Sequence, residues 1–590
     1  MVFSSSIFLF LFLPIVFFFY WLPDVFVRIK QIILKMREKG IESKENKSNT
    51  EVDTDCNEIE RDCSEPRSWH SRHCEPLKEA WQSKDNKKQK QIQQVISQPF
   101  RKYKNLVLLA FSILFYAWGE PIFVLVMILS IIANYTFGIL IDKYRSIDKE
   151  FLWLSITFNI GILFVFKYLC FTLNNIGCLI NKDFSNLKIA LPIGISFFTF
   201  QTMSYVIDIY QKKVDVQKNL FNLGLYISLF PQLIAGPIVK YVTIAKEIEN
   251  RNENYDDFAE GTIRFIRGLA KKVIIANQLA VIADAAFETP INELSTAFAW
   301  LGAIAYTLQI YFDFSGYSDM AIGLGRMFGF HFLENFNYPY TASSITDFWR
   351  RWHISLSSWF RDYVYFPLGG SRVDSKTRHI FNIFVVWLLT GIWHGANWTF
   401  IAWGLFYFVL LIIEKQTGLD KKKNWWGHIY TVFFVIIGWV LFRSTNISSA
   451  YEYLKVMFIS NGSSSDCFWL YWSNYRFYLI LGIILSFKWK SLFITKNEEA
   501  SPHSGKAVTK VTEGAAMRSI AVEGAGCRMQ SGTEGVFNGE SSHTNQTNLA
   551  LNQPHLIANF LDILCFIALF FLVISYVIRG GYNPFIYFNF

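Results

Sequence analysis

A histidine closes a long apolar stretch in the second half of the chain. The stretch covers residues 379–398 and reads HIFNIFVVWLLTGIWHGANW, with His394 at the end of its apolar part. Thr390 precedes the histidine by one helical turn, and Gly391 and Gly395 flank it at a spacing that lets another backbone or a substrate come close. Desolvation disfavours the imidazolium, so this histidine is either a neutral proton acceptor or a packing residue at a helix end.

Residues 344–372 combine arginine, histidine and serine side chains with a run of aromatic residues. Ser344, followed three residues later by Asp347, predicts a capping box at the start of a helix. At 100° per residue, one stripe of this helix is aromatic and apolar: Phe348, Trp352, Leu356, Trp359 and Tyr363. The opposite stripe is cationic and polar: Arg350, His353, Ser357 and Arg361.

A helix with these two faces, predicted over 346–363, is typical of a segment that lies in the membrane interface, here on the cytoplasmic side. Pro367, Gly369 and Gly370 follow it and end it. The cationic stripe has two interpretations. It is either an interfacial anchor only, or a site for the phosphates of a nucleotide-bearing substrate.

Two carboxylates lie within the apolar segment at 311–326. The charges of Asp313 and Asp319 each cost ~2.5 to 3.5 kcal/mol in a membrane unless they are paired or reach water. Six residues separate them, which places them about 240° apart around a helix and is poor geometry for a carboxylate dyad. We therefore expect a polar lining or structural hydrogen bonds before acid/base chemistry.

The elements that hold these side chains are predicted to be membrane helices. Hydrophobic residues make up 52% of the 590 residues, against roughly 45 to 50% in soluble proteins even when Gly is counted. The 58 Phe, 28 Tyr and 19 Trp suit hydrocarbon and the lipid-water boundary. This composition excludes an ordinary soluble enzyme. The net charge of +9 fits the anionic inner leaflet of a membrane and not a nucleic acid partner.

About 20 apolar residues cross a bilayer, and windows of this kind occur along most of the chain. They cover 6–22, 105–119, 121–141, 151–176, 188–209, 221–241, 265–287, 296–328, 379–396, 398–414, 428–443, 476–493 and 557–578. We expect an all-α polytopic transmembrane bundle with about ten to thirteen membrane segments and interfacial helices. Segment 221–241 contains Pro231, Gly236, Pro237 and Lys240, and it is predicted to be re-entrant.

Two stretches are too polar for a membrane, 37–104 and 495–553, and both are predicted to be soluble and disordered. They separate a first transmembrane helix with an amphipathic segment (1–36), a transmembrane core (105–494), and a C-terminal helix with a tail (554–590). The first stretch contains side chains that bind zinc elsewhere: Cys56, Cys63, His70, His73 and Cys74. Their spacing fits no familiar zinc finger, so we predict no metal site.

Two motifs identify a family. DFWRRWHISLSSWFRDYVYFPLGGSR at 347–372 and LLTGIWHGANWTFIAWG at 388–404 closely resemble the membrane-bound O-acyltransferase family, in its bacterial alginate O-acetyltransferase branch. Further matches are NLVLLAFSILFYAWGEP at 105–121, LPIGISFFTFQTMSYVIDIY at 191–210 and YFDFSGYSDMAIGLG at 311–325. The resemblance runs along the chain except for the two polar stretches, which depart from the family pattern.

The resemblance implies a helical bundle in which a funnel reaches a histidine at mid-membrane. An acyl thioester would enter from the cytoplasm and a hydroxyl acceptor from the outer side. His394 matches the catalytic histidine of the family, and His353 matches its other recurrent histidine position. We expect His394 to act as general base and His353 to act on the donor side.

The remaining candidates follow from the same resemblance. Arg350, Arg361 and Ser357 are expected to bind the donor, with the arginines on its phosphates. The acceptor path is expected to be lined by Asp313, Asp319, Thr390 and Asn397.

The predicted activity is transfer of an acetyl group from acetyl-CoA, a substrate and not a cofactor, to hydroxyls of an extracytoplasmic polysaccharide such as alginate. Transfer is direct or passes through a partner acetyltransferase outside the cytoplasm. The predicted location is the cell (inner or plasma) membrane, with multiple crossings and lipid contacts. Two alternatives remain, which are D-alanyl transfer to teichoic acid and a transporter that moves an acyl donor without making bonds.

Overall fold

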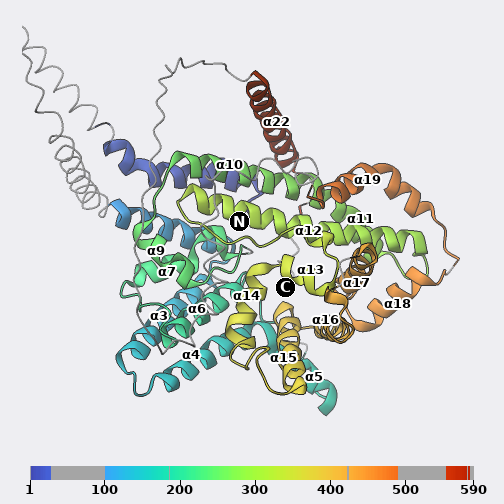
Figure 1. Ribbon diagram of the computed structural model, residues 1–590, viewed down its shortest axis with the longest axis horizontal. Helices are drawn as coiled ribbons and strands as arrows, with labels where there is room; N and C mark the ends of the chain where they lie inside the picture. Colours follow the sequence, from blue (N-terminus) through green and yellow to red (C-terminus); the bar gives the residue numbers. More distant parts are fainter. Residues whose placement is uncertain are drawn as a thin grey trace, which may run out of the picture. The chain divides into compact units, whose positions relative to one another are not determined.

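The computed structural model confirms an all-α chain. It describes residues 2–27, 29, 100–184, 186–234, 236–421, 424–460, 462–488, 553–580, 583 and 584, and no β-strand occurs within these ranges. The helices divide into two compact units, one made of residues 1–486 with 570–590 and the other of 487–569. The first unit holds every candidate site residue (Figure 1).

The first half of the chain forms helices over 6–27 and 100–119, followed by α3 (Val124–Lys143), α4 (Asp148–Leu163), η2 (Phe164–Tyr168), α5 (Leu169–Ile180), α6 (Ile195–Tyr210), α7 (Leu220–Ser228), α8 (Phe230–Leu233), α9 (Tyr241–Asn250), α10 (Tyr255–Ala270), η3 (Lys271–Ala276) and α11 (Asn277–Glu288).

The second half forms α12 (Thr296–Met327), α13 (Ile345–Arg351), α14 (Ile354–Phe360), η5 (Arg361–Tyr365), α15 (Lys376–His394), α16 (Trp398–Thr417), α17 (Trp425–Arg443), α18 (Ile447–Phe458), α19 (Asp466–Leu485) and α22 (Gln553–Ile578).

Within the residues that the structure describes, five helical segments are long and apolar enough to cross a membrane. They are Phe8–Val27, Val124–Lys143, Asp148–Ile180, Trp398–Thr417 and Trp425–Arg443. The other predicted windows also fall on helices, but these do not meet the same test of length and apolarity. The polytopic class is therefore confirmed. The predicted number of ten to thirteen membrane segments stays a prediction.

Helix α12 packs against α10 with the two backbones in contact. A Cβ atom on Gly261 would lie 2.6 Å from the carbonyl oxygen of Gly323, and one on Gly268 would lie 2.6 Å from that of Gly316. Glycines are needed here because a side chain would push the helices apart. Since α12 also packs against α11, α17, α18 and α19, it forms the scaffold for the elements that follow it.

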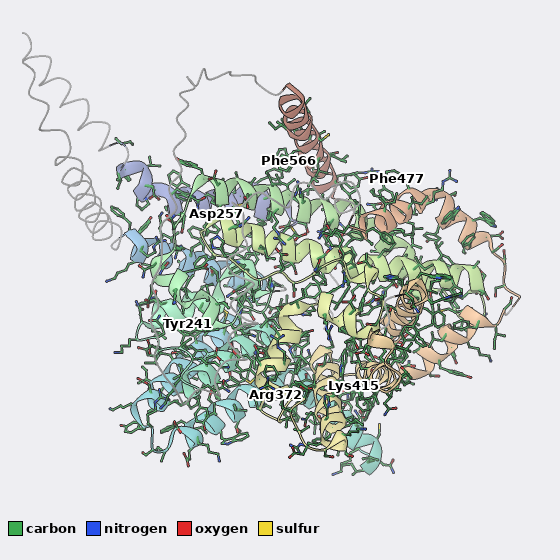
Figure 2. The ribbon with its side chains drawn as sticks, in the orientation of Figure 1. Tyr241, Asp257, Arg372, Lys415, Phe477 and Phe566 are labelled. Carbon is green, nitrogen blue, oxygen red and sulfur yellow. The ribbon has the colours of Figure 1, made fainter. Side chains whose placement is uncertain are left out.

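The aromatic stripe of residues 344–365 is a core face and not a lipid-facing one. Trp359 of α14 stacks on Phe200 of α6 with ring centroids 3.8 Å apart. Its indole nitrogen donates to the Phe200 carbonyl oxygen at 3.0 Å. The other members of the stripe, Phe348, Trp352, Leu356 and Tyr363, are also buried. The side chains in Figure 2 fill the space between these helices.

The single helix predicted over 346–363 is wrong. Ser344 does cap the start of α13, because its hydroxyl accepts from the Asp347 N–H at 3.0 Å. The helix then breaks at His353, which has φ +45° in the left-handed region, and a second helix, α14, begins. Residue Asn335 compensates for the break, since its carbonyl oxygen accepts from the Ile354 N–H at 3.0 Å.

The predicted re-entrant segment 221–241 consists of short pieces. α7 and α8 are separated at Leu229, and an extended stretch leads to α9, which starts at Tyr241 (labelled in Figure 2). The described residues from 223 to 241 are packed against other parts of the chain, and Gln232 and Ile238 are buried. Broken backbone at this depth needs protein contacts. The helix break agrees with the prediction, and re-entry from one side stays a prediction.

Most of the two polar stretches lies outside the described residues, as do the five candidate zinc ligands. The described helix over 100–119 includes residues 100–104, which the prediction places in the first stretch, and the predicted boundaries stay a prediction. Within the ranges that the structure does describe, no group of three or more side chains could hold a metal ion.

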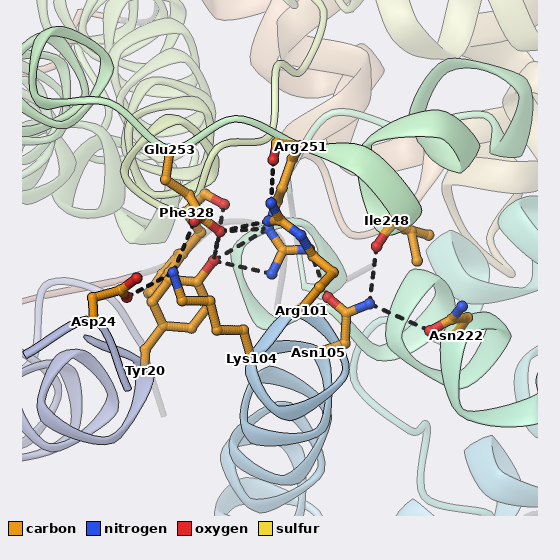
Figure 3. Close-up of polar contacts among 10 residues, drawn as sticks. All are labelled: Tyr20, Asp24, Arg101, Lys104, Asn105, Asn222, Ile248, Arg251, Glu253 and Phe328. Atoms are coloured by element: carbon orange, nitrogen blue, oxygen red, sulfur yellow. Dashed lines mark hydrogen bonds and ion pairs between the residues drawn. The ribbon is translucent and has the colours of Figure 1, made fainter. Parts of the chain in front are cut away.

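One largely buried carboxylate, Glu253, whose side chain is 10% exposed, joins three segments of the chain (Figure 3). Its oxygens lie 2.7 Å from Arg101, 2.8 Å from Lys104 and 3.2 Å from Arg251. The hydroxyl of Tyr20 donates to it at 2.6 Å. Glu253 therefore ties the N-terminal helix and the helix over 100–119, which precede and follow residues 30–99, to the linker between α9 and α10.

Replacing Glu253 with Gln is expected to lower the stability of the folded protein by about 3 to 5 kcal/mol, because the buried Lys104 and Arg251 and the partly buried Arg101 would lose their shared anion. Melting temperature in detergent measures the effect. The matched control is Glu260→Gln, an exposed carboxylate paired with Arg326, for which a loss of at most ~1 kcal/mol is expected. Equal melting temperatures for the two variants would contradict the assignment.

The same carboxylate makes stability depend on pH. Burial raises the pKa of Glu253, but Lys104 and Arg251 more than compensate, so its pKa lies below the ordinary value. A depressed carboxylate pKa contributes stability above the unfolded pKa, and this contribution is lost as the pH falls through the folded pKa. The difference in melting temperature between wild type and Glu253→Gln should therefore shrink under acid conditions and stay constant near neutral pH.

Candidate active site

His394 ends α15 with its ring enclosed by aromatic side chains. The ring centroid lies 5.0 Å from that of Trp393, 5.0 Å from that of Trp403 and 5.1 Å from that of Phe442. The side chain is 6% exposed, and its Nδ1 atom is buried with no hydrogen-bond partner in the described residues. A buried polar atom without a partner is costly, and such atoms are rare outside functional sites.

His353 sits at the break between α13 and α14 and is 2% exposed. Its Nδ1 lies 3.1 Å from Oδ1 of Asn335, and its Nε2 is buried with no partner in the described part of the chain. Its ring centroid lies 4.6 Å from that of Phe314, on α12. Burial lowers the pKa of this imidazole well below its usual value, so the ring is neutral near pH 7.

Trp393 stands between the two histidines. Its ring centroid is 6.1 Å from that of His353 and 5.0 Å from that of His394. Its indole nitrogen is also buried without a partner in the described residues. The structure thus brings together the two histidines that lie 41 positions apart in the sequence, with three unpaired nitrogens on adjoining rings.

The end of α15 is held by a π-helical turn, η2, from another part of the chain. Lys167 donates to the carbonyl oxygens of Trp393 at 2.6 Å and His394 at 3.3 Å. The neighbouring Tyr168 hydroxyl donates to the carbonyl oxygen of Ile392 at 2.8 Å. The last carbonyl groups of a helix have no partner within the helix, and here two side chains supply one for three consecutive residues. The backbone that carries His394 is therefore fixed.

The glycines beside His394 serve packing. A Cβ atom on Gly391 would lie 2.5 Å from the carbonyl oxygen of Phe400, and one on Gly395 would lie 2.3 Å from the Phe400 ring. The neighbour that comes close is thus another backbone and an aromatic ring, both in α16. A close approach by substrate at these glycines stays a prediction.

Thr390 and Asn397 use their polar atoms within the protein. The Thr390 hydroxyl donates to the Val386 carbonyl oxygen at 2.7 Å, inside α15. Asn397 caps α16, since its Oδ1 accepts from the Thr399 N–H at 3.1 Å, and its amide donates to Thr445 at 2.7 Å. None of these bonds involves an imidazole. The predicted role of Thr390 and Asn397 in lining the acceptor path stays a prediction.

The two carboxylates of α12 are ion-paired, as expected for structural bonds. Asp313 lies 2.6 Å from Nζ of Lys272. Asp319 lies 2.6 Å from Nζ of Lys271 and 2.8 Å from Arg264. These cations come from η3 and α10, so the pairs reinforce the contact between α10 and α12. A role on the acceptor path stays a prediction for both.

The predicted donor residues separate from His353. Arg350, Ser357 and Arg361 are exposed, whereas His353 points into the core. A single cationic stripe containing all four is therefore wrong, because the break at residue 353 turns the histidine inward. Arg361 pairs with Asp362 at 3.0 Å, and the Ser357 hydroxyl donates to the Trp349 carbonyl oxygen at 3.4 Å. Arg350 and Arg361 therefore lie on the exposed face of the segment 345–365, and His353 lies on its buried face.

Sequence reasoning missed Lys167, Asn335 and Trp393. Lys167 had a usable signal, because an ionisable residue within a predicted span is a functional candidate by default. Trp393 adjoins His394 but carries no pattern of its own. Asn335 lies in a loop, and nothing in the local sequence links it to a histidine 18 residues later.

The sequence of this chain is similar to those of several known proteins over much of its length. The profile of the membrane-bound O-acyltransferase family matches residues 211–450, which include both histidines. A probable alginate O-acetylase of Pseudomonas syringae is 43% identical over 368 residues, covering 61% of this chain and 70% of the relative. A peptidoglycan O-acetyltransferase of Helicobacter pylori is 36% identical over 397 residues, covering 61% of this chain and 75% of the relative.

A teichoic acid D-alanyltransferase of Bacillus subtilis is 31% identical over 280 residues, covering 42% of this chain and 68% of the relative. The three relatives are named for acyl transfer to three different cell-surface polymers. The helical fold, the paired buried histidines and these similarities agree, and the chain belongs to the membrane-bound O-acyltransferase family and is an O-acyltransferase.

Proposed function

We propose that the chain transfers an acetyl group from acetyl-CoA to a hydroxyl of an extracytoplasmic polysaccharide, and that the reaction takes place beside His353 and His394. The observation that carries the proposal is the set of unpaired nitrogens on the buried rings of His353, Trp393 and His394. Imidazole nitrogens of this kind are available to a substrate hydroxyl and suit general base catalysis.

His394 acts as the general base in this proposal. The oxygen of the acceptor hydroxyl attacks the thioester carbonyl carbon and forms the new C–O bond. At the same time the proton of the hydroxyl passes to the imidazole. Collapse of the tetrahedral intermediate breaks the C–S bond, and the leaving thiolate takes the proton from the imidazolium. The products are an O-acetyl ester and coenzyme A, and the histidine returns to its neutral form. The hold of Lys167 and Tyr168 on the end of α15 keeps the base in place.

The donor end is proposed to lie at Arg350 and Arg361. Both are exposed and lie on the α13–η5 segment that carries His353 on its inner side. A donor with charged phosphates and a small acyl group fits such an arrangement, because the phosphates stay at the surface while the thioester reaches the core. Ser357, exposed between the two arginines, adds a hydroxyl to the same surface.

The acceptor is proposed to be a polysaccharide such as alginate, reached from the inner membrane either directly or through a partner acetyltransferase. The relative from Pseudomonas syringae, named for alginate, supports this choice. The D-alanyl alternative has weaker support, because the teichoic acid relative covers 42% of this chain. A transporter would bind the donor without releasing coenzyme A, and incubation of the purified protein with radiolabelled acetyl-CoA tests for this release.

Replacing His394 with Ala is expected to reduce acetyl transfer by ~10²- to 10⁴-fold, because the general base is lost. Release of coenzyme A in the presence of acceptor or partner measures the rate. The matched control is His379→Ala, on the same helix but only half-buried and bonded to Tyr365, which should retain most of the activity. Near-normal transfer by folded His394→Ala protein would rule out the assignment.

Replacing Arg361 with Ala is expected to weaken donor binding by roughly one to two decades, because a charge-assisted phosphate contact contributes ~1.5 to 3 kcal/mol. Binding of coenzyme A to detergent-solubilised protein measures the loss. Arg145→Ala is the control, since Arg145 lies in the α3–α4 turn and pairs with Asp142. Unchanged affinity for Arg361→Ala, with loss of membrane insertion alone, would favour the anchor interpretation.

A further inference from the structure

The side chain of Asn335 joins His353 to the start of α14. Its Oδ1 accepts from the backbone N–H of Ser355 at 3.2 Å and from the Ser355 hydroxyl at 2.9 Å. The same Oδ1 lies 3.1 Å from Nδ1 of His353. On its other side, the amide nitrogen donates to the hydroxyl of Ser318, on α12, at 3.0 Å. Asn335 is itself buried, at 1% exposed.

The backbone N–H of Ser355 decides which way the amide points. A backbone N–H is always a donor, so the Asn335 atom that it contacts must be the oxygen. An amide oxygen cannot donate, so Nδ1 of His353 must carry the hydrogen of that bond. Since a neutral imidazole has one N–H, its Nε2 then carries a lone pair and no hydrogen.

We infer that Asn335 is a positioning residue for the reaction, which holds His353 in the Nδ1–H tautomer and presents Nε2 as a hydrogen-bond acceptor. The inference rests on the proposed function for its catalytic meaning. An accepting Nε2 cannot polarise a thioester carbonyl oxygen, because that needs a donor. It can instead bind a group that carries hydrogen, which here means the acceptor hydroxyl or the thiol formed from the thioester. His353 is thereby assigned to substrates with an O–H or S–H group.

The groups that contact the His353 ring are uncharged. They are Phe314 of α12, Trp393 of α15, Asn335 and Ser355. The charged and titratable groups on the packed elements are Tyr306, Tyr311, Asp313, Tyr317, Asp319 and Arg326 of α12, His331, Glu334, Tyr338 and Tyr340 of the chain between α12 and α13, Asp347, Arg350 and Arg351 of α13, Arg361, Asp362, Tyr363 and Tyr365 of η5, Lys376, Arg378, His379 and His394 of α15, and Lys167, which holds the end of α15. Among the described residues, a carboxylate introduced at position 335 would therefore be the one anion bonded to His353.

Replacing Asn335 with Asp tests the inference without removing an acceptor. The carboxylate can still accept from Ser355 and from Nδ1, and the Ser318 hydroxyl can rotate to donate to it. An anion beside Nδ1–H stabilises the imidazolium, so His353 should be protonated at higher pH. The acid limb of the kcat profile should move to higher pH by about one to three units. The measurement is kcat and KM for coenzyme A release from acetyl-CoA across pH.

A second variant and a matched control separate positioning from folding. Asn335→Leu removes the acceptor and should lower kcat by at least tenfold with little change in donor KM. Asn446→Asp is the control, because Asn446 also accepts from a backbone N–H and a hydroxyl, both of Ser449, but contacts no histidine. This control should keep the wild-type pH profile. A wild-type profile for Asn335→Asp, or wild-type kcat for Asn335→Leu, would overturn the inference.

The tautomer is also measurable without any activity. Nitrogen-15 NMR of histidine-labelled protein, with the His353 signals identified by their loss in His353→Gln, should show a protonated Nδ1 and an unprotonated Nε2. A protonated Nε2 would overturn the inference even if acetyl transfer were demonstrated. Absence of coenzyme A release by the wild-type protein with acceptor and partner supplied, together with the expected tautomer, would instead reject the proposed function and leave the positioning by Asn335 standing.

Discussion

The need of every buried polar group for a partner governs this structure, because water is absent from the protein core and from lipid. The carboxylates of α12 meet it with lysine and arginine side chains, and Glu253 meets it with three cations. The requirement is left unmet around Trp393, where Nε2 of His353, Nδ1 of His394 and the indole nitrogen of Trp393 have no partner in the described residues. Leaving them so costs free energy, and a substrate that supplies the missing partners offsets that cost.

The residues that place the two histidines come from distant parts of the sequence. Lys167, in η2, binds the end of α15, and Asn335, in the loop after α12, holds the start of α14. Glu414 of α16 accepts from the N–H of Thr346 at 2.9 Å and from its hydroxyl at 2.7 Å, which fixes the start of α13. Each bond satisfies a helix end that would otherwise lack a partner. The site is thus held by the ends of short helices and not by one continuous element.

The sequence allowed the class of fold to be predicted, because apolar windows and aromatic content are local properties. It also allowed His394 to be singled out, because a histidine after an apolar run is visible without a structure. Periodicity failed at residues 346–363, since it assumes an unbroken helix and cannot register a residue in the left-handed region such as His353. The partners of the histidines could not be predicted either, because the bonds of Lys167 and Asn335 depend on tertiary contacts that no spacing in the sequence encodes.

The central claim is that acyl transfer occurs where the rings of His353, Trp393 and His394 meet. A cryo-electron microscopy structure with a non-reactive thioether or amide analogue of acetyl-CoA tests it most directly. The account predicts that the acyl carbon lies within hydrogen-bonding reach of an imidazole nitrogen in this cluster, with the phosphates at the surface that carries Arg350 and Arg361. An acyl group bound elsewhere, with both imidazoles still enclosed by aromatic side chains and out of its reach, would contradict it.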